Sequence, residues 1–291
     1  MYIHALSNYP AGDISQYGQP QNYELIGKRF DFAMDDGIDY SVTFLDKSAL
    51  EWSFEGETPR RAAGYLCVKA DDLTYLVSYV LEGEEPRANH TFVIDLENQL
   101  VTRIISRVGE NPRYPYLITP RYEFGAIRQG GAEVALYPRH GYTNDMIGNV
   151  VQWKYGDMME RVHVYYCANY YRIIYPPEQA SSYVFNEALA GLPSRDEPTA
   201  YIKIKDGVYL FSLTEQNTEK LVGDKLPYRS NTMCFLQNYH RVSQVGRSFG
   251  TFSKDGVDAG IHITFGACGK VIGAKEEYLQ KLLRDPNPFL T

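Results

Sequence analysis

Arg172 lies in a run, Y-Y-R-I-I, whose side chains alternate between the two faces of a predicted strand. Alternation places Tyr171 and Ile173 on the face opposite Arg172, but it does not say which face is inward. A guanidinium inside a small protein core is costly unless it is paired with an acid or bound to an anion. An inward Arg172 would hold a carboxylate or phenolate, whereas an outward Arg172 would be a solvated surface residue.

Histidines occur in similar alternating runs. His163 lies between Val162 and Val164, and His262 lies in I-H-I-T. An inward histidine is a candidate general base, because its ordinary pKa is close to neutral pH. The simpler alternative is an outward, solvated orientation. His140, in R-H-G-Y, either lines the mouth of a binding site or makes structural hydrogen bonds.

Metal and nucleotide cofactors are not expected from the motifs. The six histidines form neither H-x-H nor H-E-x-x-H, and the four cysteines form no C-x-x-C. The cysteines lie in or beside apolar runs, which predicts buried packing residues in a reduced, cytoplasmic protein. There is no Walker A motif and no G-x-G-x-x-G after a strand. Residues 246–250 match G-x-S-x-G, but a strand and turn follow, which argues against a hydrolase nucleophile elbow.

The composition is that of a soluble globular protein, with 44% apolar and 22% charged residues in a chain of 291. A net charge of −7 argues against nucleic acid as a partner, and no apolar run is long enough to cross a membrane. The 25 tyrosines suit a cavity for an aromatic ligand, although tyrosine is also favoured in strands.

Short strand-like runs separated by turn residues fill most of the chain. Asp35-Asp36-Gly37, between two such runs, predicts a hairpin. Residues 109–145 are rich in Pro, Gly, Tyr and Arg and predict irregular structure. Only the segment after residue 274 has clear helical spacing.

The two halves resemble each other. Residues 25–27 match 146–148, and D-x-x-Y-L-x-S recurs at 72–78 and 206–212. Thr91 and Thr232 also match. Two copies of a β-rich unit predict two successive antiparallel barrels, because closure removes the unpaired edges of a sheet. A barrel of about eight strands has room for one small ligand.

Several motifs carry a family resemblance. They are G-K-R-F-D-F-x-x-D-D-G at 27–37, Y-L-V-S-Y at 75–79, E-F-G-A-I at 123–127, R-H-x-x-T-x-D-x-I-G at 139–148 and W-x-Y at 153–155. In order and spacing they resemble the molybdenum cofactor biosynthesis protein F (MoaF) family over about residues 25–270. The resemblance implies an all-β fold of two tandem lipocalin-like (calycin) barrels. The expected parts are an extended arm (1–24), a first barrel (25–126), a connector (127–145), a second barrel (146–274) and a C-terminal helix and tail (275–291).

The strand pattern also resembles the phenolic acid decarboxylases, which are single barrels of this type. In the second half, Tyr155 falls on one catalytic tyrosine of that family, Trp153 replaces the other, Arg172 falls on the arginine, and Glu197 lies beside the glutamate position. The counterparts in the first half are Phe32, Met34, Ser53 and Gly64, which have no acid, base or phenol.

The resemblance implies a site in the second barrel. Arg172 would anchor an anion, Tyr155 would donate or relay a proton, and Glu197 or His163 would orient or deprotonate the substrate. Further candidate binding residues are Trp153, Tyr165, Tyr170 and His140.

Two functions remain open from the sequence. One is a small-molecule enzyme that uses acid–base chemistry without a cofactor, of the lyase or isomerase type, acting on a compact aromatic or carboxylated metabolite. The other is a non-catalytic lipocalin-like carrier. The tyrosine-rich surface would permit a homodimer.

Overall fold

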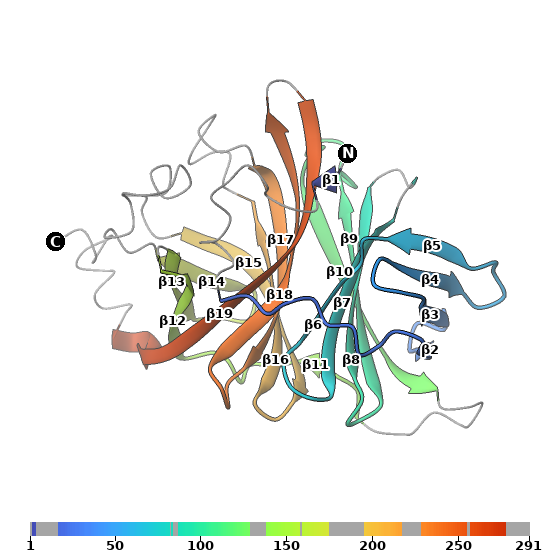
Figure 1. Ribbon diagram of the computed structural model, residues 1–291. Coiled ribbons are helices and arrows are strands. Elements are labelled where there is room, and N and C mark those ends of the chain that lie inside the picture. The colour runs from blue at the N-terminus through green and yellow to red at the C-terminus, as the bar shows by residue number, and fades with distance from the viewer. Residues whose placement is uncertain are drawn as a thin grey trace. The chain divides into compact units, whose positions relative to one another are not determined.

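The computed structural model describes residues 2–3, 17–81, 83, 87–128, 138–157, 159–174, 195–216, 228–254 and 257–277. The chain divides into two compact units, residues 20–141 and residues 142–291 together with the first 19 residues. Almost all regular structure in both units is β-strand (Figure 1). The predicted all-β fold is therefore confirmed. No helix among the described residues is long and apolar enough to span a membrane.

The C-terminal unit is a closed antiparallel barrel of eight strands. Each strand pairs with the next along the chain, and the last returns to pair with the first. The strands are β12 (Asn149–Gly156), β13 (Met159–Tyr165), β14 (Tyr170–Ile174), β15 (Arg195–Lys205), β16 (Val208–Glu215), β17 (Tyr228–Asn238), β18 (Ser243–Lys254) and β19 (Val257–Ala274). Two short strands, β1 (Tyr2–Ile3) and β11 (Gly141–Tyr142), pair with β19 and β15.

The interior of this barrel follows the two-residue period of its strands. Trp153 and Tyr155 of β12 point into one apolar cluster with Tyr165 and Tyr171. Val162 and Val164 of β13 belong to a separate cluster on the other face. These two clusters identify the inward and outward sets of side chains on each strand.

The N-terminal unit is a nine-stranded antiparallel sheet around one apolar core. Its strands are β2 (Arg29–Met34), β3 (Tyr40–Phe44), β4 (Ala49–Phe54), β5 (Arg60–Ala63), β6 (Leu66–Lys69), β7 (Thr74–Leu81), β8 (Ala88–Asp95), β9 (Leu100–Val108) and β10 (Ile118–Arg128). The order across the sheet runs from β5 through β4, β3, β2, β10, β9, β8 and β7 to β6. All nine strands contribute residues to this core, for example Phe32, Trp52, Ala62 and Cys67. The contribution of β10 is Ile127.

The two units share one topology. In the C-terminal barrel the first part of β15 pairs with β14 and the rest pairs with β16. In the N-terminal unit β5 pairs with β4 and β6 pairs with β7, so these two strands together occupy the place of β15. Between them Gly64 has a φ of 67°, a left-handed conformation that glycine adopts most readily. The interruption leaves the N-terminal ladder open between β5 and β6.

Several local predictions can be compared with the structure. The hairpin at Asp35-Asp36-Gly37 is confirmed, since β2 and β3 pair on either side of it. The expectation of irregular structure at 109–145 is wrong in part, because β10 occupies residues 118–128. Residues 275–277 form a helical turn, and the rest of the predicted C-terminal helix lies outside the described residues. Cys67 and Cys234 are buried as predicted, but Cys268 is exposed.

The G-x-S-x-G match at 246–250 lies within β18 and is extended, so it forms no strand–turn–helix elbow. A Cβ atom at Gly246 would lie 1.9 Å from the carbonyl oxygen of Cys234 on β17. The replacement Gly246→Ala should therefore force β17 and β18 apart and lower the free energy of unfolding by about 1–3 kcal/mol, the usual cost of overpacking. Gly141→Ala is the control, because a Cβ there meets nothing within 4 Å. Equal melting temperatures for the two variants in a thermal melt would contradict this packing.

Candidate functional site

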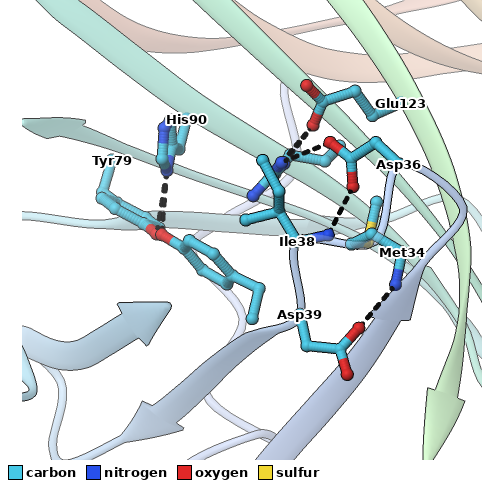
Figure 2. A network of polar contacts seen from close by, with 9 residues as sticks. Met34, Asp36, Ile38, Asp39, Tyr79, His90 and Glu123 are labelled. Carbon is cyan, nitrogen blue, oxygen red and sulfur yellow. Dashed lines mark hydrogen bonds and ion pairs between the residues drawn. The ribbon is translucent and has the colours of Figure 1, made fainter. Parts of the chain in front are cut away.

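Two phenols and one imidazole meet inside the N-terminal sheet. Tyr40 of β3, Tyr79 of β7 and His90 of β8 all belong to inward-facing sets, and each is at most 1% exposed. The Tyr40 hydroxyl lies 2.8 Å from Nδ1 of His90 and makes a short hydrogen bond with the Tyr79 hydroxyl. The Tyr79 hydroxyl lies 3.4 Å from the same ring nitrogen (Figure 2). We call Tyr40, Tyr79 and His90 the phenol–imidazole cluster.

Aromatic rings enclose this cluster. The ring of Trp52 stacks on Tyr40 with 5.6 Å between centroids and meets His90 edge-on at 5.5 Å. Phe92 lies 5.1 Å from Tyr40 on another side. These walls exclude water from the hydroxyl groups, so hydrogen bonds within the cluster act in a low local dielectric.

His90 is neutral at ordinary pH. Burial is the main cause that lowers its pKa well below the usual value, and the positive charges of Arg103 and Arg107 lower it further. A neutral imidazole beside two phenols can take part in a hydrogen-bonded row along which a proton is shared. It does not act as a cation there.

Arg103 of β9 brings a charge into the same interior. Its side chain is only 2% exposed, and its guanidinium lies 5.2 Å from the ring centre of Tyr40 and 5.8 Å from that of Phe54. Glu123 of β10 pairs closely with Nε and Nη2, and Asp36 of the β2–β3 turn lies 3.4 Å from Nη2. Figure 2 shows the carboxylates of Glu123 and Asp36 converging on this group. The remaining nitrogen, Nη1, is buried without a hydrogen-bond partner.

A hollow of about 490 Å³ adjoins the cluster. Most of its walls are outward-facing side chains of β2, β3 and β4, so it lies largely on the other side of the sheet from the phenol–imidazole cluster. It meets the interior set at Tyr40 and Phe54, the two rings that contact the guanidinium. Its polar lining consists of Arg29, Asp31, Asp39, Ser41, Ser53, Glu55, Glu57 and Arg128.

The C-terminal barrel has a different polar interior. The Tyr165 hydroxyl accepts hydrogen bonds from Trp153 Nε1 at 3.0 Å and from Gln237 Nε2 at 2.8 Å. Gln237 also donates to Gln244 at 2.9 Å, and Gln244 donates to the Tyr155 hydroxyl at 2.7 Å. These neutral side chains therefore form a hydrogen-bonded network in which each is bonded to another member.

His163 belongs to this network and points inward. Its Nδ1 lies 3.3 Å from the Tyr165 hydroxyl. Burial, with a smaller contribution from the charge of Arg161, lowers its pKa to about 3, so it is neutral at pH 7. Burial also raises the pKa of Tyr165 well above the usual value. His262 is buried too, but on the face of β19 opposite the core residues Ile261 and Ile263.

The structure brings together only part of the site that the sequence predicts. Trp153, Tyr155, His163 and Tyr165 share the barrel interior, and Glu197 is fully buried on the inward face of β15. Tyr170 and Arg172 lie on the outward face of β14, opposite the core residue Tyr171.

The structure does not bring Arg172 and Glu197 to one site. The Arg172 guanidinium binds Asp196 through two hydrogen bonds of 2.7 Å, because register places these two residues opposite each other on β14 and β15. Glu197 instead accepts a hydrogen bond from the backbone N–H of Gln216 at 3.0 Å. In this geometry Arg172 does not reach an anion in the barrel interior.

His140 lies in the N-terminal unit, away from the site predicted for it. Its Nδ1 is 2.8 Å from the Thr102 hydroxyl, and its Nε2 is 3.6 Å from Asp95. Both Thr102 and Asp95 are fully buried. These contacts attach the segment after β10 to β8 and β9.

The sequence interpretation missed Tyr40, Tyr79, His90 and Arg103. It compared the first half with the decarboxylase pattern at four other positions. The signal available was a charged residue within an apolar run, V-T-R-I-I at 101–105, and a histidine within A-N-H-T-F-V at 88–93. In the structure the first run lies in β9 and the second in β8, and both strands pack into the same core.

These features define an antiparallel β protein with a buried polar cluster in its closed C-terminal barrel and another in its open N-terminal sheet. Residues 11–110 match the family model described as the MoaF N-terminal domain. This segment is therefore similar to the MoaF N-terminal domain, in agreement with the resemblance of its motifs, and it includes Tyr40, Tyr79, His90 and Arg103. No curated protein matches the chain. Within the parts of the chain that the structure describes, no group of three His, Cys, Asp or Glu side chains is arranged to hold a metal ion.

The buried histidines should make stability depend on pH. Below about pH 6.5 the unfolded chain protonates His163, whereas the folded chain, with a pKa of about 3, does not. The unfolded state then binds more protons, so unfolding free energy should fall by about 1.4 kcal/mol per pH unit for this residue as pH decreases through that window. His90 acts in the same direction.

His163→Asn should reduce the slope of unfolding free energy against pH by about 1.4 kcal/mol per pH unit. The measurement is denaturant unfolding at several pH values between 6.5 and 4. His240→Asn is the matched control, because His240 is exposed. If both variants kept the slope of the unsubstituted chain, His163 would not be held neutral by the fold.

Proposed function

We propose that this chain is a MoaF-like small-molecule enzyme that uses acid–base chemistry of the lyase or isomerase type on a compact aromatic or carboxylated metabolite. The observation that carries the proposal is the phenol–imidazole cluster, buried beside the Arg103 guanidinium in the N-terminal unit. The proposal moves the reacting groups from the second barrel to the N-terminal unit. It uses no metal or nucleotide cofactor.

A comparison within the chain supports a chemical role for these residues. The hairpin turns β8–β9 and β17–β18 correspond, with Gln99 and Val242 in the same left-handed conformation at φ 57° and 45°. Strand register from these turns gives the C-terminal counterparts of Tyr79, His90, Arg103 and Glu123, which are Leu213, Met233, Gly246 and Phe265. The same barrel topology thus forms with none of these four polar groups.

Burying such groups has a free-energy cost that apolar residues avoid. Since the fold does not need them, a functional use is the natural reason for their presence. The cluster can supply a proton from a phenol and receive one on a phenolate or a neutral imidazole, which is what a lyase or isomerase step requires. The guanidinium stabilises negative charge that develops on a substrate oxygen.

The surroundings suit a planar ligand. Trp52, Phe92 and Phe54 offer ring faces and edges within contact distance of Tyr40. The hollow of about 490 Å³ is within the usual range for small-molecule sites; it lies largely on the other face of the sheet and adjoins this interior at Phe32, Tyr40 and Phe54.

A carrier is the second candidate. It is favoured by the C-terminal barrel, where Trp153, Tyr155, Tyr165, Gln237 and Gln244 satisfy one another and none is charged. A network of neutral aromatic and amide groups of this kind is typical of a binding cavity or a rigid core. Turnover distinguishes the two functions.

The test begins with a thermal-shift screen of hydroxycinnamates, other phenolic acids, neutral phenols and pterins, followed by chromatography of incubated hits. Tyr40→Phe and Tyr79→Phe should each lower turnover by about 10²–10⁴, the usual contribution of an acid–base group, while the ligand still raises the melting temperature. Tyr155→Phe, which removes a buried hydroxyl from the other barrel, is the matched control and should leave turnover nearly unchanged.

Loss of turnover in Tyr155→Phe alone would return the site to the second barrel. A ligand that binds but is never converted would support the carrier.

A further inference from the structure

Arg103 presents an unused donor inside the N-terminal unit. Its Nε and Nη2 atoms are engaged by Glu123 and Asp36, but Nη1 is buried and has no partner. A guanidinium has five N–H donors, and leaving the Nη1 pair unsatisfied in a core is unfavourable. A bound group with acceptor oxygens would satisfy them.

We infer that the N-terminal unit binds an aromatic monocarboxylate whose carboxylate takes the place of Asp36 on Arg103. This inference rests on the proposed function, because it assigns the ligand of the same interior. In this arrangement Asp36 competes with the ligand for Arg103, and this competition sets the affinity for the ligand.

Charge explains why a carboxylate of the protein must leave. Glu123 and Asp36 already place two negative groups on one guanidinium. A third carboxylate would be repelled at hydrogen-bond distance in a poorly solvated interior. A ligand anion therefore binds only if one of the two moves away.

The contacts identify Asp36 as the group that moves. Glu123 contacts two nitrogens of the guanidinium, is 15% exposed and lies on the central strand β10. Asp36 makes one contact with the guanidinium, at 3.4 Å, is 32% exposed and lies in the β2–β3 turn, where its other oxygen accepts a hydrogen bond from the Ile38 N–H at 3.0 Å. Water can solvate the displaced carboxylate of Asp36, whereas Glu123 would remain largely buried.

The turn does not have to open for this exchange. Asp35 donates its N–H to the Phe124 carbonyl at 2.9 Å, and its side chain pairs with Arg139 at 3.0 Å. Asp39 pairs with Arg128 and accepts a hydrogen bond from the Met34 N–H at 3.3 Å (Figure 2). These contacts hold the hairpin on both sides of Asp36, so the exchange needs only a rotation of its side chain, in which water replaces its hydrogen bond with the exposed Ile38 N–H.

The rings beside the guanidinium favour an aromatic ligand. Tyr40 and Phe54 lie within 6 Å of it, at 5.2 and 5.8 Å. A carboxylate bonded directly to a ring, or through a short unsaturated link, places that ring against them while its oxygens reach Nη1 and Nη2. The ligand class is therefore a planar monocarboxylate such as a benzoate or a cinnamate.

The experiment measures dissociation constants by calorimetry for 4-hydroxycinnamate and benzoate, with their primary amides as neutral probes. Asp36→Asn should bind the carboxylates about fivefold to tenfold more tightly than the unsubstituted chain, because the competing charge is gone. Asp35→Asn, the neighbouring acid of the same turn, should leave these affinities unchanged. Neither substitution should alter binding of the amides.

Arg103→Lys provides a second measurement that keeps a cation in the core. It should weaken carboxylate binding and leave amide binding intact, because the ammonium lacks the forked donors of the guanidinium. If Asp36→Asn and Asp35→Asn gave the same carboxylate affinity, or if the amides gained as much as the acids, the inference would be overturned. Binding of neutral phenols without any binding of carboxylates would overturn this inference and leave the proposed function standing, whereas the absence of binding by every probe would reject both.

Discussion

The interior of a small β-barrel is closed to water, and this constraint governs how the chain arranges its polar groups. A buried hydroxyl, amide or charge is tolerated only when another group of the protein pairs with it. The C-terminal barrel meets the requirement with neutral groups that bond to one another from Trp153 to Tyr155. The N-terminal unit instead buries a cation with two acids and three proton-carrying groups around it, and one nitrogen of the cation stays unpaired. The N-terminal arrangement offers an unused cationic donor beside groups that can exchange protons, which suits it to binding and chemistry.

The duplicated topology turns this contrast into an argument about function. Both units fold by the same strand order, so the residues that differ at matching positions are not dictated by the fold. Phe32 and Met34 match Trp153 and Tyr155, while Arg103 matches Gly246, where a Cβ would collide with the next strand. The close approach of β17 and β18 at Gly246 excludes any side chain there. The N-terminal unit carries the guanidinium at the corresponding position, with the carboxylates of Glu123 and Asp36 paired to it.

The fold could be predicted from the sequence more completely than the site. Alternation, turn residues and the internal repeat predicted an all-β chain, because these patterns follow from local geometry. Alternation also grouped Tyr170 with Arg172 correctly, but the choice of inward face depends on packing, and Tyr171 occupies the interior instead. The internal repeat was misaligned at one of its matches. Thr91 was matched with Thr232, whereas the strand register makes Cys234 the counterpart of Thr91, because the turn at Val242 fixes the hairpin. Tyr40 and Arg103 were missed because their partners come from strands distant in sequence.

The one topological difference between the units lies next to the proposed site. β15 joins β14 to β16 without a break, which closes the C-terminal barrel. In the N-terminal unit the break at Gly64 leaves β5 with a hydrogen-bonded neighbour, β4, on one side only among the described strands. Opening the β4–β5 hairpin therefore breaks fewer hydrogen bonds than opening any strand of the closed barrel, and segments of this kind have the lowest local stability. That hairpin carries Phe54, whose ring lies on the guanidinium, and residues 55–57 and 59, which line the hollow. The strand that the N-terminal unit does not complete thus belongs to a hairpin that carries both a ring in contact with Arg103 and part of the lining of the hollow.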